Sequence, residues 1–286
     1  MVVGSVAQLG ERLLRKQEAG GSTPPRSTFF KFTAPDTDKP MHRFLCPNAN
    51  FESGFLEITD KQEIHHLKDV LRLKANDTVV VFDGKGKGAA GVIYSLKKNT
   101  VRVRIKEILR ETKKLTVVSL ACAIPKKAKF EFIIEKCTEL GVDEIIPLQT
   151  KRTEIKLTSD KKDKKLRRYQ TVAANAAKQS QRTAIPHIYP VTDINEALKT
   201  HLNADTASFI ACLSGKRQNL LEIMKGWQTP PKRILFFIGP EGDFADEELN
   251  QARNAGATAI TLGERVLKVD TAAISVVSLI SFFFGL

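Results

Sequence analysis

The chain has 286 residues, which is room for a small and a larger module, each with its own hydrophobic core. Its net charge of +13 favours a polyanionic partner, and nucleic acid is the commonest large polyanion. An anionic membrane would attract the same charge, but the sequence has no basic amphipathic helix with a Trp-rich apolar face. Composition therefore favours a nucleic-acid-binding protein, the alternative being a basic protein without such a partner.

Cysteine and histidine usage argues against a metal centre. The five histidines show no metal-ligand spacing, and no CxxC pair occurs among the four cysteines, Cys46, Cys122, Cys137 and Cys212. We therefore expect no metal, no disulfide framework and a cytoplasmic location. The longest apolar stretch, near residues 271–286, is interrupted by Thr and Ser. It is too short to span a bilayer comfortably and predicts a buried helix, so no membrane contact is expected.

Residues 1–40 differ from the rest of the chain. They are rich in turn formers, as in GGSTPPRST and APDTDKP, and carry no hydrophobic period. They also lack the apolar region of a signal peptide. The stretch SVAQLGERLLRKQEAGGSTPPRSTF is similar to peptides produced when a transfer-RNA gene is translated by mistake. We expect a disordered or mis-annotated extension with the true start at Met41, the alternative being a short basic arm that contacts RNA.

Residues 41–112 predict a compact β-rich module. A strand at Thr78–Phe82 leads through DGKGKG into a second apolar run at residues 89–96, which is the pattern of a β-hairpin. In residues 101–106 (VRVRIK) apolar and basic residues alternate, so one face of that strand is buried and the other presents cations. A short helix is expected before the hairpin, at residues 65–73.

From residue 113 to residue 286 the pattern changes to alternating strands and helices. Several expected strands are continuous apolar runs, as in a parallel sheet covered by helices on both faces. The expected strands are 115–124, 144–148, 207–213, 233–238 and 259–262. The expected helices are 130–140, 164–181, 193–201 and 246–255. The fold class predicted for this module is α/β.

One glycine motif is misleading. The segment from Gly86 to Gly91 (GKGAAG) satisfies the GxGxxG pattern of dinucleotide-binding sites and follows a strand. Such a site needs a helix to begin there, so that its N-terminus faces the pyrophosphate. The chain continues instead into the β-rich run at 89–96. We interpret the motif as a glycine-rich hairpin.

Two loops of the α/β module carry a more specific signal. IGPEGDF, from Ile238 to Phe244, follows an apolar strand and precedes a helix with three early acids. LGERVLKVDTAA, from Leu262 to Ala273, again joins a strand to a helix, with Asp270 or Thr271 as the expected N-cap. Ligands of open α/β sheets bind where such loops leave the carboxyl ends of strands. A plain strand-to-helix turn is the alternative for either loop taken alone.

Together these loops resemble the two signature motifs of the uridine-N3 ribosomal RNA methyltransferases of the SPOUT superfamily, IGPEGG-F and LG-x-R-I-L-R-x-E-T-A. The resemblance covers nearly the whole chain from Met41. It includes the opening MHRF, an H…VLR element ending at Arg72, KFEFIIEKCTELG at 129–141 and QSQR…P at 179–186. The chain departs from the family pattern at Lys178, Gln181, Asp243, Lys268 and Asp270. At position 268 lysine keeps the charge of arginine but loses its bidentate fork.

The resemblance implies a SPOUT-type parallel sheet with a C-terminal trefoil knot, preceded by a small PUA-like RNA-binding domain. Such enzymes bind S-adenosylmethionine in the knot loops and are typically homodimers. The apolar helix from Thr271 is a candidate for that interface. Carried over to this sequence, the cofactor-binding residues are Leu213, Gly239, Glu241, Gly242, Leu262, Gly263, Val266 and Leu267.

Methylation of uridine N3 requires an electrophilic methyl group, supplied by the cofactor, and removal of the N3 proton. The protein must align the reactants and stabilise negative charge on the uracil. Arg152, Arg182 and Arg43 are the candidate catalytic residues, and phosphate binding is their alternative role. Glu241 and Asp270 are alternative general bases, although either one could instead only orient its own loop.

Basic residues concentrate in one segment. Residues 151–182 contain eleven Lys or Arg and three Asp or Glu, a local charge of 11 − 3 = +8. A solvated helix face is the usual explanation of a charge run, but an RNA-binding surface is favoured here by the additional basic row at 101–106. The predicted RNA-binding residues are Arg72, Arg102, Arg104, Lys161, Lys162, Lys164, Lys165 and Lys268.

The function predicted from the resemblance is S-adenosylmethionine-dependent methylation of N3 of a uridine in 16S ribosomal RNA, within the assembled small subunit. Two alternatives remain. One is a SPOUT methyltransferase acting on a different RNA base. The other is an RNA-binding ribosome-assembly factor with a degenerate methyltransferase domain, an alternative that the departures at Asp243 and Lys268 leave open. Cofactor binding discriminates the second alternative from an enzyme.

Overall fold

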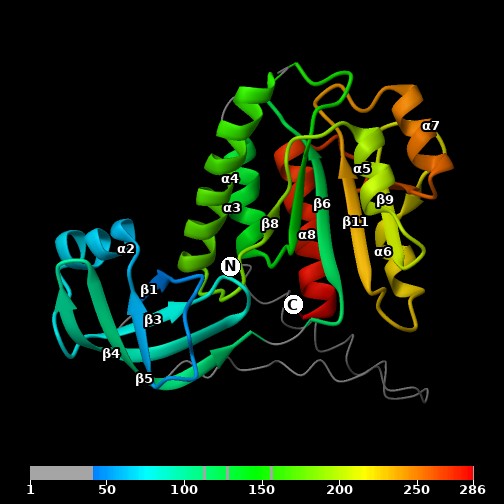
Figure 1. Ribbon diagram of the computed structural model, residues 1–286. Coiled ribbons are helices and arrows are strands. Elements are labelled where there is room, and N and C mark those ends of the chain that lie inside the picture. Colours follow the sequence, from blue (N-terminus) through cyan, green and yellow to red (C-terminus); the bar gives the residue numbers. More distant parts are fainter. Residues whose placement is uncertain (1–40, 112–113, 127–128, 155–156, 286) are drawn as a thin grey trace, which may run out of the picture. The chain divides into compact units, whose positions relative to one another are not determined.

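The computed structural model describes residues 41–285 except 112–113, 127–128 and 155–156. The expectation for residues 1–40 lies outside this range. The described chain contains two β-sheets, one of five and one of seven strands (Figure 1). The first sheet ends at Arg110 and the first strand of the second begins at Val117. The domain boundary near residue 112 stays a prediction.

The first sheet has the order β1-β3-β4-β5-β2. β1 runs parallel to β3, and the remaining pairs are antiparallel. The predicted hairpin is confirmed, because β3 and β4 pair directly through the glycine-rich segment. The strands are β1 (His42–Leu45), β2 (Phe55–Ile58), β3 (Thr78–Phe82), β4 (Lys87–Lys97) and β5 (Thr100–Arg110).

The glycine motif has a packing role. A Cβ on Gly91 would lie 2.4 Å from the carbonyl oxygen of Arg104 on the neighbouring strand, so only glycine fits there. The alternation on β5 is also as predicted. Val101 and Val103 are fully buried in the core of this sheet, whereas Arg102 and Arg104 are exposed.

The helical segment of the first sheet begins earlier than expected. An α-helix, α2, spans Lys61–His65, and a π-helical turn continues it over His66–Val70. Asp60 sets the start, because its side chain accepts hydrogen bonds from the backbone N–H groups of Gln62 and Glu63. The expected range 65–73 was therefore displaced towards the C-terminus.

The second sheet is parallel throughout, with the order β10-β12-β9-β11-β6-β7-β8. Each of the five predicted strands is present, with its ends shifted by at most two residues. The strands are β6 (Val117–Ala123), β7 (Glu144–Leu148), β8 (His187–Ile188), β9 (Thr206–Ala211), β10 (Gln218–Asn219), β11 (Arg233–Ile238) and β12 (Thr258–Thr261). The α/β fold class is confirmed.

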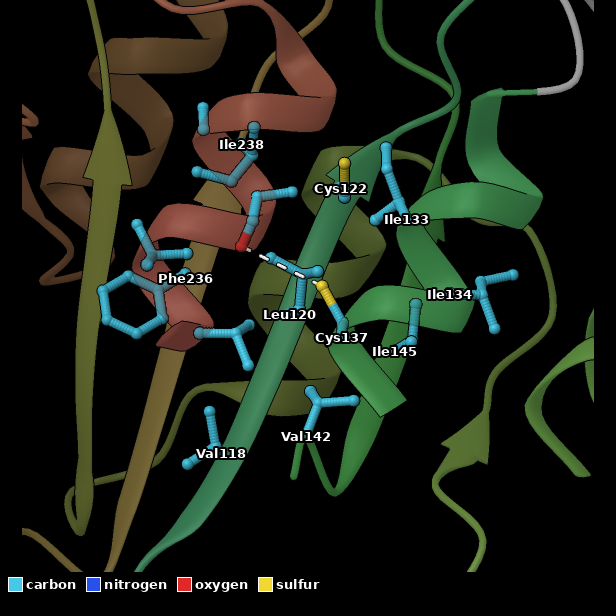
Figure 2. Packing of buried hydrophobic residues seen from close by; sticks show 14 of the residues in the cluster. Val118, Leu120, Cys122, Ile133, Ile134, Cys137, Val142, Ile145, Phe236 and Ile238 are labelled. Atoms are coloured by element: carbon cyan, nitrogen blue, oxygen red, sulfur yellow. Dashed lines mark hydrogen bonds between the residues drawn. The ribbon is translucent and has the colours of Figure 1, made fainter. Parts of the chain in front are cut away.

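Helices cover both faces of this sheet. They are α3 (Lys129–Glu139), α4 (Ser159–Gln179), α5 (Ile194–His201), α6 (Leu220–Lys225), α7 (Asp246–Asn254) and α8 (Val269–Phe284). Alternate residues of β6 and β11 enter two separate hydrophobic cores, one beneath α3, α4, α6 and α8 and the other beneath α5 and α7. In the first, Val118, Leu120 and Cys122 pack against Ile133 and neighbouring residues of α3 (Figure 2).

Two helix starts differ from the sequence prediction. α4 begins at Ser159, five residues before the expected Lys164, so the lysine-rich segment is helical. α8 begins at Val269, and the Ala272 N–H donates to the carbonyl oxygen of Lys268 at 2.8 Å. Neither Asp270 nor Thr271 is therefore the N-cap, because both already lie in the first turn. The carboxylate of Asp270 instead forms an ion pair with Lys129 at 3.3 Å.

Across the described ranges, no helix combines the length and apolar character needed to cross a membrane. Within the same residues, no group of three or more His, Cys, Asp or Glu side chains is arranged to hold a metal ion. The trefoil knot implied by the resemblance stays a prediction.

Candidate functional site

A cavity of about 210 Å³ opens at the carboxyl ends of β9, β11 and β12, the edge at which parallel sheets bind ligands. Seven of the eight residues expected to bind the cofactor line it: Leu213, Gly239, Glu241, Leu262, Gly263, Val266 and Leu267. The eighth, Gly242, lies outside the lining, beneath the side chain of Arg152. The two motif loops, which begin 24 residues apart in sequence at Ile238 and Leu262, therefore form one wall each of a single cavity.

The loop between β11 and α7 has an unusual backbone at its centre. Asp243 adopts a φ of +60°, a conformation that glycine adopts without strain and that Asp tolerates better than most residues. Its Oδ2 accepts a hydrogen bond from the Leu213 N–H at 2.8 Å, and its Oδ1 accepts one from the Phe244 N–H at 2.8 Å. The departure from the family glycine thus adds a polar link between two loops that line the cavity.

Arg152 holds the same loop from its outer side. Its Nη1 donates to the carbonyl oxygens of Gly242 at 2.8 Å and Phe244 at 3.2 Å. The neighbouring Lys151 N–H donates to the carboxylate of Glu248, which also accepts from the Ala245 N–H, both at 2.9 Å. The segment after β7 is therefore fastened to the start of α7. Arg152 supports the cavity wall and does not line the cavity.

Two glycines shape the walls for different reasons. A Cβ on Gly239 would lie 3.0 Å from the Phe244 ring, so a larger residue would displace the loop itself. Gly263 has a φ of +120° with open space around its Cα, so there the backbone conformation requires glycine. Both glycines hold backbone at the cavity surface.

A thiol also lies at this cavity. Burial raises the pKa of Cys212, with a further contribution from the carboxylate of Asp243. Its Sγ donates to the carbonyl oxygen of Ser214 at 3.5 Å. The thiol is therefore protonated at neutral pH, whereas the thiolate is the nucleophilic form. Covalent catalysis by Cys212 is not favoured.

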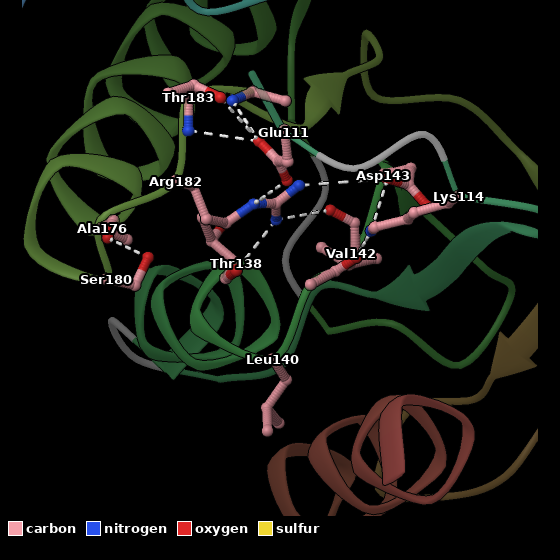
Figure 3. A network of polar contacts seen from close by, with 12 residues as sticks. Glu111, Lys114, Thr138, Leu140, Val142, Asp143, Ala176, Ser180, Arg182 and Thr183 are labelled. Atoms are coloured by element: carbon pink, nitrogen blue, oxygen red, sulfur yellow. Dashed lines mark hydrogen bonds and ion pairs between the residues drawn. The ribbon is translucent and has the colours of Figure 1, made fainter. Parts of the chain in front are cut away.

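Arg182 lies elsewhere, in a polar network between the end of α4 and the segment that precedes β6 (Figure 3). The residue is 9% exposed, and its Nη1 donates to the carbonyl oxygens of Thr138 and Val142, both at 2.9 Å. Its Nε lies 3.5 Å from a carboxylate oxygen of Glu111, close enough for an ion pair but without a hydrogen bond. This side chain is enclosed by protein acceptors and does not line the cavity, which favours a structural role over the predicted catalytic one.

Arg43 contacts the same polar network around Arg182, which we call the Arg182 junction. Its Nη2 donates to the carbonyl oxygen of Arg182 at 3.2 Å, and its guanidinium lies 5.4 Å from the centre of the Phe82 ring. Burial lowers the pKa of Arg43, and the nearby carboxylate of Glu111 partly opposes that shift. None of the three candidate catalytic arginines therefore lines the cavity. Arg217 and Arg265 do, and sequence reasoning missed both.

The predicted RNA-binding residues fall on several surfaces. Lys161, Lys162, Lys164 and Lys165 share the first turns of α4, and among the described residues none of the four forms an ion pair. Arg72 is exposed with a φ of +56°, and Lys268 is exposed just before α8. Arg102 and Arg104 are exposed on β5. All of these side chains are exposed except those of Lys162 and Lys165, which are half-buried, so most of the set is accessible to phosphate groups.

Comparison with known proteins identifies the class. The model of the RNA methyltransferase domain family matches residues 111–281, and that of the RNA methyltransferase PUA domain matches residues 58–106. The chain thus has the architecture of a PUA-containing RNA methyltransferase. It belongs to the family of ribosomal RNA small subunit methyltransferase E.

Three relatives illustrate the match. The chain is 33% identical to the ribosomal RNA small subunit methyltransferase E of Mesomycoplasma hyopneumoniae, over 82% of this chain and 96% of the relative. It is 29% identical to that of Bacillus subtilis, over 80% and 95%. The crystal structure of the Neisseria gonorrhoeae enzyme, bound to S-adenosyl methionine, superposes with a TM-score of 0.75 at 27% identity, covering 86% of this chain and 98% of that one.

Proposed function

We propose that this protein transfers a methyl group from S-adenosylmethionine to N3 of a uridine in 16S ribosomal RNA. The observation that carries the proposal is the single cavity formed by the two motif loops at the carboxyl ends of β9, β11 and β12. Related methyltransferases that act on small-subunit ribosomal RNA support the choice of substrate. The choice of N3 follows from the family resemblance.

The residues of the cavity fit this cofactor. Its apolar wall, which includes Leu262 and Leu267, suits an adenine ring, and the exposed backbone near Gly239 and Gly263 offers hydrogen bonds to it. Charged side chains of both signs also line the cavity, from Arg217 to Glu241. S-adenosylmethionine carries both a carboxylate and an ammonium group, so a lining of mixed charge matches it.

The bound cofactor would supply the electrophilic methyl group. The chain itself must remove a proton from uridine N3 and stabilise the resulting negative charge. We favour Glu241 as the proton acceptor, because it lines the cavity, whereas Asp270 does not and is paired with Lys129. We favour Arg265 for charge stabilisation, since it lines the cavity and, over the described part of the chain, makes no ion pair.

The surroundings support the partners that we propose. The lysines at the start of α4 would contact phosphate groups of the RNA, in the context of the assembled small subunit and therefore in the cytoplasm. Exposed apolar side chains near the end of α8, Phe282 at 81% and Phe283 at 43%, suit an interface between two copies of the chain. We propose a homodimer, which analytical ultracentrifugation would test.

The test is methyl transfer to ribosomal RNA. Small subunits from a strain that lacks the gene should gain one N3-methyluridine when incubated with the protein and S-adenosylmethionine, detected by mass spectrometry of nuclease digests. Glu241→Gln and Arg265→Gln should lower turnover at saturating RNA more than they weaken cofactor binding. A methyl group on another base would identify a different target, and transfer to no RNA would overturn the proposal.

Calorimetry distinguishes the proposed enzyme from the alternative, an assembly factor without methyltransferase activity. A degenerate domain would give no heat with S-adenosylmethionine, whereas the proposed enzyme should bind it with a stoichiometry of one per chain. Asp243, one of the departures that left this alternative open, occupies a glycine-like conformation and bonds to the Leu213 N–H. It therefore leaves the cavity formed.

A further inference from the structure

The outer face of the first sheet carries a row of alternating aromatic and guanidinium groups. The Arg102 guanidinium lies 4.3 Å from the centre of the Phe55 ring, and the Arg104 guanidinium lies 5.6 Å from the centre of the Tyr94 ring. The two rings meet edge to face, with centroids 5.3 Å apart. Four planar groups from three strands therefore lie side by side on one surface, which we call the Arg–aromatic row.

A β-bulge brings Tyr94 into this row. On β4, Ile93 pairs with Val103 and Ser95 pairs with Arg102, so Tyr94 is an extra residue without a partner on β5. Bulges redirect a side chain from the regular alternation of the strand. Here the bulge leaves Tyr94 53% exposed beside Phe55, while Ile93 remains fully buried in the core. The row is thus an outward-facing feature and not part of the hydrophobic core, which does not include Phe55 or Tyr94.

Charge and shape around the row indicate one kind of occupant. Residues 94–106 contain five Lys or Arg and no Asp or Glu. A cavity of about 300 Å³ adjoins the row at Phe55 and Arg102, and it is also lined by the polar side chains of Asn48, Asn50, Ser53 and Glu57. Aromatic and guanidinium planes stack on nucleobases, and cations beside them attract the phosphate backbone. The neighbouring amides and carboxylate offer partners to the edge of a base.

We infer that the Arg–aromatic row binds an unpaired nucleotide of the RNA substrate, with the base stacked on Tyr94 and its edge against Phe55. This inference rests on the proposed function, because it assigns to the first domain a specific contact with the same RNA. It also assigns different roles to the aromatic and the basic side chains of that domain. Tyr94 and Phe55 recognise that a base is unpaired, whereas cations such as Lys106 contribute only charge.

The experiment uses the full chain without cofactor and two single-stranded RNA nonamers. One carries 2-aminopurine at its centre, and the other carries an abasic site there. The unchanged protein should quench 2-aminopurine fluorescence and bind the first nonamer more tightly. Tyr94→Ala should abolish the quenching and weaken binding of the first nonamer by about 5- to 150-fold, the range for losing one stacked base. Its affinity for the abasic nonamer should stay within about twofold of the unchanged protein's.

Two matched variants complete the test. Tyr94→Phe should keep both the quenching and the preference, because the ring is retained. Lys106→Ala, which removes an exposed cation of the same strand, should weaken both nonamers equally and keep the quenching. If Tyr94→Ala binds like the unchanged protein, or weakens both nonamers equally, the inference is wrong. Loss of methyl transfer or of cofactor heat would count against the proposed function alone, since this assay contains neither cofactor nor turnover.

Discussion

The loop cavity and the Arg182 junction were both expected to serve the reaction, but their polar groups differ in whether they are accessible to a ligand. At the cavity, backbone of Gly239 and Gly263 lines open space, and charged side chains remain accessible. At the junction, Arg182 is enclosed, and its guanidinium donates to two carbonyl oxygens of the chain itself. Polar groups that are satisfied within the fold stabilise it, whereas those held apart and left open are available to a ligand.

The strongest test of this comparison is Arg182→Met. Removing one partner of a buried ion pair costs about 3–5 kcal/mol, because the carboxylates lose the positive charge beside them and the two carbonyls lose their donor. We expect the free energy of unfolding, measured in urea, to fall by about that amount. Turnover of the folded fraction at a permissive temperature should be nearly unchanged.

The control for Arg182 is an arginine within α4. Arg168 pairs with Glu131 at 2.9 Å, but its side chain is 60% exposed. Arg168→Met should therefore cost less than about 1 kcal/mol. If Arg182→Met unfolds normally but turns over slowly at saturating RNA, the original catalytic interpretation of Arg182 would be restored.

The four lysines at the start of α4 contrast with Arg182, because within the described chain none of them forms an ion pair. Changing Lys161, Lys162, Lys164 and Lys165 to Ala should reduce the log–log salt slope of RNA binding by about 3–4, at roughly 0.7–0.9 per phosphate contact. Cofactor affinity should stay the same. The matched control removes the same charge elsewhere, at Lys61, Lys199, Lys225 and Lys232. An equal reduction in both proteins would mean that the first turns of α4 act only through net charge.

Gly263→Ala tests whether the cavity wall depends on a backbone conformation. An alanine at a φ of +120° is strained by about 1–3 kcal/mol, which the loop relieves by moving. We expect cofactor affinity, measured by calorimetry, to fall by about tenfold. Gly256 is the matched control, since it has a φ of +95° and equally open surroundings but does not line the cavity. Gly256→Ala should lose stability and keep cofactor affinity.

The smallest effect is expected at Asp243. Asp243→Gly relieves the positive φ but removes the hydrogen bond to the Leu213 N–H, which is worth about 1 kcal/mol. Cofactor affinity should fall by a few-fold, while Asp243→Asn, which keeps an acceptor and tolerates the same φ, should bind nearly as well as the unchanged protein. Tighter binding by the glycine variant would show that the carboxylate opposes the cofactor.

Sequence reasoning located the strands of the second sheet because apolar runs such as RILFF are bounded by turn formers. It located the cavity because the two motif loops follow strands of one parallel sheet and resemble the signature motifs of a cofactor-binding family. It could not place Arg182, whose acceptors at Thr138 and Val142 are about forty residues away in sequence. Nor could it place Tyr94, because a bulge there breaks the two-residue period of the strand. The positive φ of Asp243 is not evident from the aspartate itself, since glycine is the residue that usually marks such a conformation.

Arg152 connects two segments that meet different ligands under the proposed function. It follows β7 and precedes the lysine-rich helix, yet its guanidinium bonds to the carbonyl oxygens of Gly242 and Phe244 in the loop beside the cavity. Under the proposed function, RNA that moves Arg152 on binding would therefore also move the loop beside the cofactor. The coupling between the two is reciprocal, so any factor by which RNA tightens cofactor binding is the factor by which cofactor tightens RNA binding.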